Sequence, residues 1–331
     1  MLSGWNNESA QAVLAAMSDV AHAQDDTPKH QAMVEAAAKH VFEIPLDVGS
    51  LPQISPDELA AAVTSDEQRF LATQLLVLVP YADTVVDEFE VDRVDQYAKA
   101  LGTSPDNLAD LHKVRQGHIR RLLIDYFRRG ATNVQVAGDD SGILKRTVAE
   151  IHQYAGDAKI TAKYLPLADY DEGTLGRTFF DFYRARGFSL PGEKHSLGEE
   201  VVSHDCTHIL SGFNTDGTGE INVAGFEAGM KSSDFGFELL MEVILDFQLG
   251  IDFGVGLVGY KTKTGEMDPD QMMKGISKGL ACKMDIMGPD WSFWEVADKN
   301  VRDLRDQYGI TGVDEILLPP PEKPATSDGE P

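Results

Sequence analysis

The chain has 331 residues, of which 29 are basic and 54 acidic, so its formal net charge is −25. Hydrophobic residues make up 42% and charged residues 25%, which is ordinary for a globular protein and argues against wholesale disorder. So acidic a chain repels phosphate backbones and anionic lipid headgroups, and no basic patch offsets this charge. The composition therefore excludes nucleic acid as a partner and restricts any lipid contact to a local, apolar one. The length favours about two domains.

The sequence indicates a reducing compartment. Its two cysteines, Cys206 and Cys282, are too few for a disulfide framework or a four-cysteine zinc site. The first residues lack the basic and apolar runs of a secretory signal, and they are not arginine-rich like a transit peptide. Residues 70–79 are too short to span a membrane, and residues 237–260 carry four acidic side chains. We expect a soluble cytoplasmic protein without a transmembrane segment, and peripheral association with a membrane stays open.

Helical signals follow one another along the chain. Alanine-rich residues 8–23 and 29–43 predict a first pair of helices, which a segment with proline and glycine ends at 45–56. Ser55 and Pro56 then form a strong helix start, and further helices are expected over 65–80, 87–101, 104–115 and 117–129. A helix over 143–155 follows the glycine-rich segment 130–142. Shorter helices with more aromatic residues begin near 165, and no alternating pattern predicts a sheet.

These signals predict an all-α protein of two helical modules. The first module is expected over residues 1–130, and a linker with a connecting helix over 131–160. The second module, with a metal site on a helix and the loop that follows it, is expected over 161–315. The proline-rich residues 316–331 cannot pack a core and are predicted to be a disordered tail.

One segment carries the residues of a metal site. His204 and His208 are four residues apart, so on a helix both imidazoles project from one face and can share a cation. Asp205 lies about 100° further around the helix, where it would complete the site or orient a ligand. Glycines and polar residues over 212–219 allow a reversal that returns Glu220 to the same point. Such donors suit Zn²⁺ first, with Mn²⁺ or Fe²⁺ as alternatives.

A surface coincidence of two histidines is the competing interpretation of this segment. Cys206 lies off the face of the two histidines and is expected to be a small buried residue rather than a ligand or nucleophile. His195 is expected on an exposed loop. The acidic stripe of residues 238, 242 and 246 predicts the solvated face of an amphipathic helix.

The pattern HDxxH, followed by eleven residues and a glutamate, resembles the signature of the Coq4 family of ubiquinone-biosynthesis proteins. In this sequence it comprises His204, Asp205, His208 and Glu220 with unchanged spacing. The resemblance extends over about residues 165–312. It includes the segment EGTLGR at 172–177, the residues Phe182, Tyr183, Arg186, Gly187 and Phe188, the pairs Gly275 with Gly279 and Trp294 with Glu295, and the segment 301–310.

The resemblance implies an all-α fold and a divalent metal, usually zinc, held by the four matching residues. It also implies action on a polyprenylated aromatic quinone precursor, either in oxidative decarboxylation at ring carbon C1 or as an organiser of a biosynthetic complex. In the first case Asp205 or Glu220 would act as ligand or proton shuttle. Other quinone-biosynthesis proteins are then expected partners, and a homo-oligomer stays open.

The N-terminal half carries a fainter likeness. The acidic segment 82–90, which leads through a helix to Leu101 and Gly102, resembles TerB-like (tellurite-resistance type) helical domains. A cluster of Asp83, Asp87, Glu88 and Glu90 could attract a divalent cation by its charge. The preferred interpretation is a solvated helix N-terminus, where the helix dipole stabilises acidic residues.

Two alternatives to a metal enzyme remain open. In a non-catalytic scaffold or lipid chaperone, the metal would only pin helices together. The methionines between 267 and 287 and the pair Gly275 and Gly279 would suit the wall of a prenyl-lipid groove, or equally a helix core. A metal-dependent phosphohydrolase of the HD type fits poorly, since it needs a further histidine upstream and an aspartate downstream.

Overall fold

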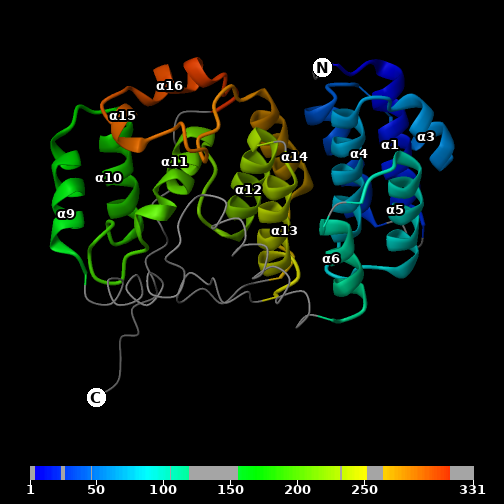
Figure 1. Ribbon diagram of the computed structural model, residues 1–331, viewed down its shortest axis with the longest axis horizontal. Coiled ribbons are helices and arrows are strands. Elements are labelled where there is room, and N and C mark those ends of the chain that lie inside the picture. The colour runs from blue at the N-terminus through cyan, green and yellow to red at the C-terminus, as the bar shows by residue number, and fades with distance from the viewer. Residues whose placement is uncertain are drawn as a thin grey trace. The chain divides into compact units, whose positions relative to one another are not determined.

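The computed structural model describes residues 4–23, 27–45, 47–104, 106–118, 156–231, 233–251 and 264–313. Every regular element within these ranges is a helix, and the β-type pairing among them is one isolated bridge between Thr174 and Asn300 (Figure 1). The predicted all-α class is confirmed. The predicted helix over 117–129, apart from its first two residues, and the predicted features at 130–142, 143–155 and 316–331 lie outside the described residues. No helix in the described ranges is both long and apolar enough to cross a bilayer.

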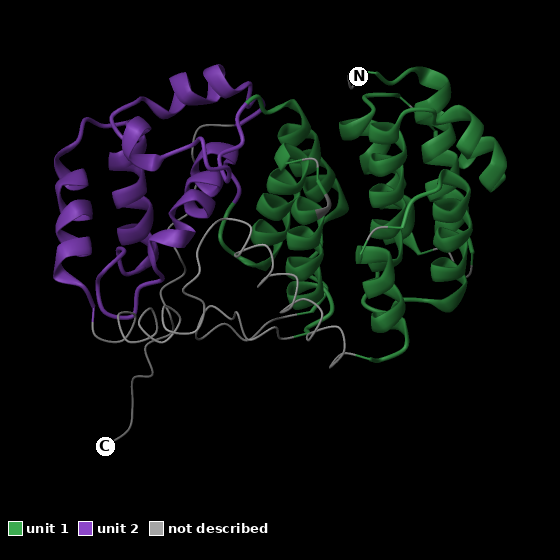
Figure 2. Cartoon of the chain, viewed as in Figure 1, with its two compact units in different colours: residues 1–136, 214–283 green, residues 137–213, 284–331 purple. Residues whose placement is uncertain are grey.

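The chain forms two compact units, each built from two stretches of sequence (Figure 2). The first unit contains residues 1–136 and 214–283, and the second contains residues 137–213 and 284–331. This grouping differs from the sequential division predicted above, because residues 214–283 pack with the N-terminal helices. Lys39 and His40 both contact the Asp270 carboxylate, at 2.7 and 2.8 Å. Independent folding of the two predicted modules stays a prediction.

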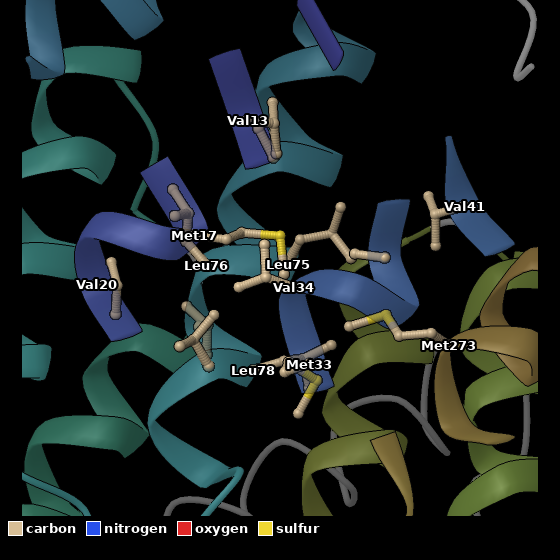
Figure 3. Packing of buried hydrophobic residues seen from close by; sticks show 14 of the residues in the cluster. Val13, Met17, Val20, Met33, Val34, Val41, Leu75, Leu76, Leu78 and Met273 are labelled. Atoms are coloured by element: carbon tan, nitrogen blue, oxygen red, sulfur yellow. The ribbon is translucent and has the colours of Figure 1, made fainter. Parts of the chain in front are cut away.

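The first unit holds the larger set of helices. They are α1 (Asn7–Ala21), α2 (Pro28–Ala36), η1 (Ala37–Val41), η2 (Val48–Ser50), α3 (Pro56–Ala62), α4 (Asp66–Leu78), η3 (Val79–Tyr81), α5 (Glu88–Leu101), α6 (Asp106–Arg115), α12 (Gly217–Lys231), α13 (Asp234–Phe247) and α14 (Pro269–Ala281). Their apolar faces meet in one core, in which Met17, Val34 and Leu75 are fully buried and Met273 of α14 joins residues of the N-terminal helices (Figure 3).

Helix starts in this unit follow the predicted capping chemistry. The Ser55 side chain accepts a hydrogen bond from the Glu58 backbone N–H, and the Glu58 carboxylate accepts one from the Ser55 backbone N–H. Asp87 and Glu90 form the same reciprocal cap at the start of α5. Glu90 is buried and lies 3.0 Å from the His30 ring. The acidic cluster is therefore a helix N-terminus, as preferred above, and the TerB-like likeness stays a prediction.

Helices α12 and α14 pack so closely that glycines are required between them. A Cβ atom at Gly275 would lie 2.3 Å from the Asn222 carbonyl oxygen, and one at Gly279 would lie 2.0 Å from that of Phe226. The glycine pair thus faces another helix and not a lipid chain. Methionines 267, 272 and 273 are buried in the same core. The structure therefore favours helix packing over a lipid-groove wall for these residues.

The second unit is built around short helices and aromatic side chains. Its helices are α9 (Ala158–Tyr164), η4 (Leu165–Asp169), α10 (Leu175–Arg186), η5 (Glu199–Val201), α11 (Val202–Ser211), α15 (Phe293–Val296) and α16 (Val301–Tyr308). The start of α10 is tied to the segment before α16, because the Gly176 N–H donates to the Ala297 carbonyl at 2.7 Å. A Cβ atom at Gly176 would lie 2.9 Å from that oxygen, so only glycine fits.

Candidate metal centre

Helix α11 presents two histidines from one face, as their spacing predicts. His204 and His208 lie one helical turn apart, and their Nε2 atoms are 3.2 Å from each other. Their rings meet edge to face, with centroids 4.8 Å apart. The two Nε2 atoms are therefore as close together as two nitrogen ligands of one cation.

The chain around His208 fixes which nitrogen faces that position. Gly212 ends α11 in the left-handed conformation, with φ of 80°, and turns the backbone back toward the helix. The carbonyl oxygen of Phe213 then lies 3.2 Å from His208 Nδ1. With Nδ1–H donating to this carbonyl, the proton is absent from Nε2 and that nitrogen is available as a ligand. His208 is fully buried, and the Phe182 ring lies beside it with centroids 6.2 Å apart.

Glu220 stands in the first turn of α12, where the predicted reversal delivers it. The Asp216 side chain accepts a hydrogen bond from the Gly219 N–H at 2.8 Å and so starts this helix. One ligand atom from each of His204, His208 and Glu220 lies within 4.8 Å of the others. Two imidazoles and a carboxylate are a donor set that zinc, manganese or ferrous iron accepts. The residues present thus fit a divalent metal, and their chemistry does not select among these ions.

Asp205 is not one of the residues in this group. Its carboxylate accepts a hydrogen bond from the hydroxyl of Tyr183, on α10. Tyr183 is almost fully buried, and burial followed by the charge of Asp205 raises the pKa of its phenol. Four donors around one point were expected, and the structure brings together three of them. Asp205 leaves α11 about 100° around from His204, on the side where the Tyr183 hydroxyl binds its carboxylate.

Two residues that position α11 escaped the sequence analysis in this role. Tyr183 was noted only as part of a family resemblance, and Arg305 of α16 only within a matching segment. The Arg305 guanidinium donates to the carbonyl oxygens of Ile209 and Leu210, at 2.7 and 3.0 Å. These carbonyls belong to the last turn of α11, where helix geometry leaves them without a partner inside the helix. No local pattern marks either contact, because both join distant parts of the chain.

The remaining candidates behave as expected, with one exception. Cys206 is fully buried, and burial followed by the charge of Asp205 raises the pKa of its thiol, so it is unsuited to nucleophilic chemistry. His195 is exposed on a loop. The acidic stripe of α13 is the exception: Glu238 is buried, and burial followed by the charge of Asp246 raises the pKa of Glu242. The prediction of a solvated face is therefore wrong.

Comparisons with known proteins add little to this geometry. No protein-family model matches the chain, and no curated protein matches it. Among solved structures, a crystal structure of a protein from Nostoc punctiforme, provisionally described as a ubiquinone biosynthesis protein, matches with 17% identity and a TM-score of 0.30. The match covers 75% of this chain and 100% of that one. A similarity at this level establishes no shared activity.

Proposed function

We propose that this protein is a Coq4-like protein of isoprenoid quinone biosynthesis that binds a divalent metal, with zinc as the first candidate, and a polyprenylated aromatic precursor. The observation that carries the proposal is the convergence of His204 and His208 Nε2 atoms at 3.2 Å, in a segment that keeps the complete HDxxH-to-Glu spacing. The spacing of four predicts that both imidazoles share one face of the helix, and the distance between the two Nε2 atoms agrees with that prediction.

The donor set favours a catalytic role for the metal over a purely structural one. Closed structural zinc sites usually have four protein ligands and are rich in cysteine, whereas catalytic sites keep three protein ligands and an open position. The group here has two histidines and one glutamate, with no cysteine. Three donors of this kind leave room for an oxygen of the substrate.

Each residue of the site then has a distinct task. His204 and His208 would hold the cation through Nε2, and Glu220 would supply an anionic oxygen. When bound, a divalent cation supplies Lewis-acid stabilisation of a phenolate or carboxylate oxygen on an aromatic ring. The reaction that the resemblance implies is oxidative decarboxylation at ring carbon C1. The Asp205 carboxylate, hydrogen-bonded to Tyr183, is the candidate for moving a proton beside that carbon.

Replacing His208 by alanine tests the metal site. We expect zinc affinity to fall by at least about 100-fold, because one of two imidazole ligands is lost. His204→Ala should give the same loss, and since His204 is less buried than His208 it carries a smaller folding risk. His112→Ala is the matched control, because that histidine pairs with Asp95 in α5 and not with the site. Zinc content by mass spectrometry of the purified full chain provides the measurement.

The same variants separate catalysis from scaffolding. If the metal serves catalysis, His204→Ala should stay folded and still retain lipid, while turnover of a prenylated hydroxybenzoate disappears. If the metal only pins helices together, the melting temperature should fall because metal binding is coupled to folding. A native chain that binds no zinc, manganese or iron, or variants with unchanged metal content, would contradict the proposal.

A further inference from the structure

Helix α12 carries a second buried glutamate besides Glu220. Glu227 follows it by seven residues and is only 3% exposed to solvent. Seven residues are nearly two full turns, so the two side chains leave the helix within about 20° of each other and about 10 Å apart along its axis. Both glutamates therefore lie on one face of α12. Because Glu220 belongs to the donor group with the two histidines, this is the face turned toward the metal position.

The packing of α12 against α14 supports this assignment of faces. A Cβ atom at Gly225 would lie 3.0 Å from the Met272 carbonyl oxygen of α14, and one at Gly229 would lie 2.2 Å from that of Ile276. By the 100° step of the helix, both glycines lie about 140–180° around from the two glutamates. Helix α14 thus occupies the opposite side of α12, and Glu227 leaves the helix away from it.

A buried carboxylate at this spacing suits an oxygen at the far end of an aromatic ring. A carboxylate can accept up to four hydrogen bonds, so Glu227 can bind a hydroxyl group in addition to its contacts within the chain. A ring with one oxygen substituent at the metal position and another at its opposite end, extended by a hydrogen bond of about 2.7 Å, reaches roughly as far as the two glutamates are apart along the helix. The second oxygen must carry a hydrogen, because an ionised carboxylate only accepts.

We propose that Glu227 is a specificity-determining residue of the metal site, which accepts a hydrogen bond from a hydroxyl group at the end of the substrate ring opposite the metal. The substrate class is then a 4-hydroxybenzoate that carries its prenyl chain at another ring position, and a ring without that hydroxyl is a poor ligand. This inference rests on the proposed function and deepens it, because it names a ring substituent that the chain selects. It adds no ligand to the metal.

Binding of two compounds to the zinc-loaded full chain, measured by titration calorimetry, tests this inference. They are 3-geranyl-4-hydroxybenzoate and 3-geranylbenzoate, which differ only in the ring hydroxyl. We expect the native chain to bind the first at least about tenfold more tightly, because only that compound donates a hydrogen bond to the buried carboxylate. Glu227→Leu should bind both compounds alike and keep its zinc content. Glu227→Gln keeps the size of the side chain and an uncharged acceptor, so its preference should be at least about threefold smaller than the native one.

Glu238→Leu is the matched control, because it removes a buried carboxylate of α13 in the same unit. Its preference for the hydroxylated compound should equal that of the native chain, even if its melting temperature falls. If Glu227→Leu does not fold, Glu227→Gln decides, and a native-like preference there would overturn the inference.

The native chain also separates this inference from the proposed function. Zinc binding without a preference for the hydroxylated compound, whether the chain binds both compounds or neither, would overturn the role of Glu227 and leave the metal site standing. A preference that survives in a folded Glu227→Leu would do the same. A native chain that binds no divalent metal would instead refute the proposed function, and with it this inference.

Discussion

Helix α14 in the first unit and helix α11 in the second are held in place in different ways. Helix α14 meets α12 backbone to backbone, and glycines on both helices make this approach possible: Gly225, Gly229, Gly275 and Gly279. Helix α11 is held by side chains that reach it from other helices, Arg305 at its last turn and Tyr183 at Asp205. The first arrangement depends on shape alone, and the second on directed hydrogen bonds.

This difference suits the tasks of the two helices. Close helix packing is satisfied by many similar small contacts and tolerates small shifts of a side chain. A metal site needs ligands held to within about half an ångström, which directed bonds to the helix that carries them provide. Apart from Glu220 itself, we therefore expect substitutions in the first unit to act on stability, and substitutions around α11 to act on stability and metal binding together.

The largest effect is expected for Gly279→Ala. The new Cβ atom would lie 2.0 Å from the Phe226 carbonyl oxygen and 2.6 Å from the Met230 nitrogen. Both are backbone atoms, so the two helices must move apart. We expect a loss of about 3 kcal/mol in the free energy of unfolding, which exceeds the gain of about 1 kcal/mol that alanine brings to a helix. Urea denaturation followed by circular dichroism measures this difference.

Gly49→Ala is the control for that substitution. A Cβ atom there would meet only the Asp47 side chain, at 3.4 Å, which is ordinary contact. Its free energy of unfolding should change by less than about 0.5 kcal/mol. An equal effect at both glycines would contradict the shape-based account of the α12–α14 contact.

A smaller effect is expected for Arg305→Met, which keeps an unbranched side chain and removes every donor. The carbonyls of Ile209 and Leu210 then lose their partner inside the second unit, at a cost of about 2 kcal/mol. Arg302→Met is the control, because Arg302 is exposed on the same helix. Two of the chain's three tryptophans, Trp291 and Trp294, lie in the second unit, so fluorescence during urea denaturation follows this region.

Zinc affinity gives a second measurement on the same variant. If the bonds from Arg305 position α11, Arg305→Met should also weaken zinc binding, and Arg305→Lys should restore part of it. Equal stability and equal affinity in Arg305→Met and Arg302→Met would show that this contact does not hold the helix.

Most of the helices could be predicted from the sequence because their signals are local. Ser55, Pro56 and Glu58 lie within four residues and form the cap that they predict. The histidine pair has the same advantage, since a spacing of four places both rings on one face whatever surrounds them. The position of Glu220 followed from the glycines before it.

The errors concern contacts between distant residues. Tyr183 and Asp205 are 22 positions apart, and Arg305 and Leu210 are 95 apart. Nothing in a single sequence pairs them. The grouping of residues 214–283 with the N-terminal helices was missed for the same reason. The Gln248 amide donates to the Tyr81 carbonyl oxygen at 3.2 Å, and these two residues are 167 positions apart. The burial of Glu238 was missed because amphipathic periodicity predicts only which residues share a face.

The smallest effect is expected for Glu193→Gln in the second unit. Glu193 forms a two-pronged pair with Arg184, with N–O distances of 2.9 and 2.7 Å. The hydrogen bond from Arg184 holds the pKa of Glu193 below its usual 4.5, against the opposing effect of partial burial, and a bond from the Leu190 N–H adds to the lowering. At neutral pH we expect a loss of about 0.5–1 kcal/mol in the free energy of unfolding, because the pair is partly exposed.

The sign of the pH dependence checks the origin of this loss. A carboxylate whose pKa is lower in the folded chain than in the unfolded chain stabilises the fold above the unfolded pKa. That contribution disappears as the pH falls through the folded pKa. The native chain and Glu193→Gln should therefore differ at pH 7 and converge as the pH falls through the lowered pKa of Glu193, while the exposed control Glu172→Gln shows little difference at either pH. A gap between the native chain and Glu193→Gln that persists in acid would show that the glutamine disturbs packing, and that the ion pair with Arg184 contributes nothing measurable to the second unit.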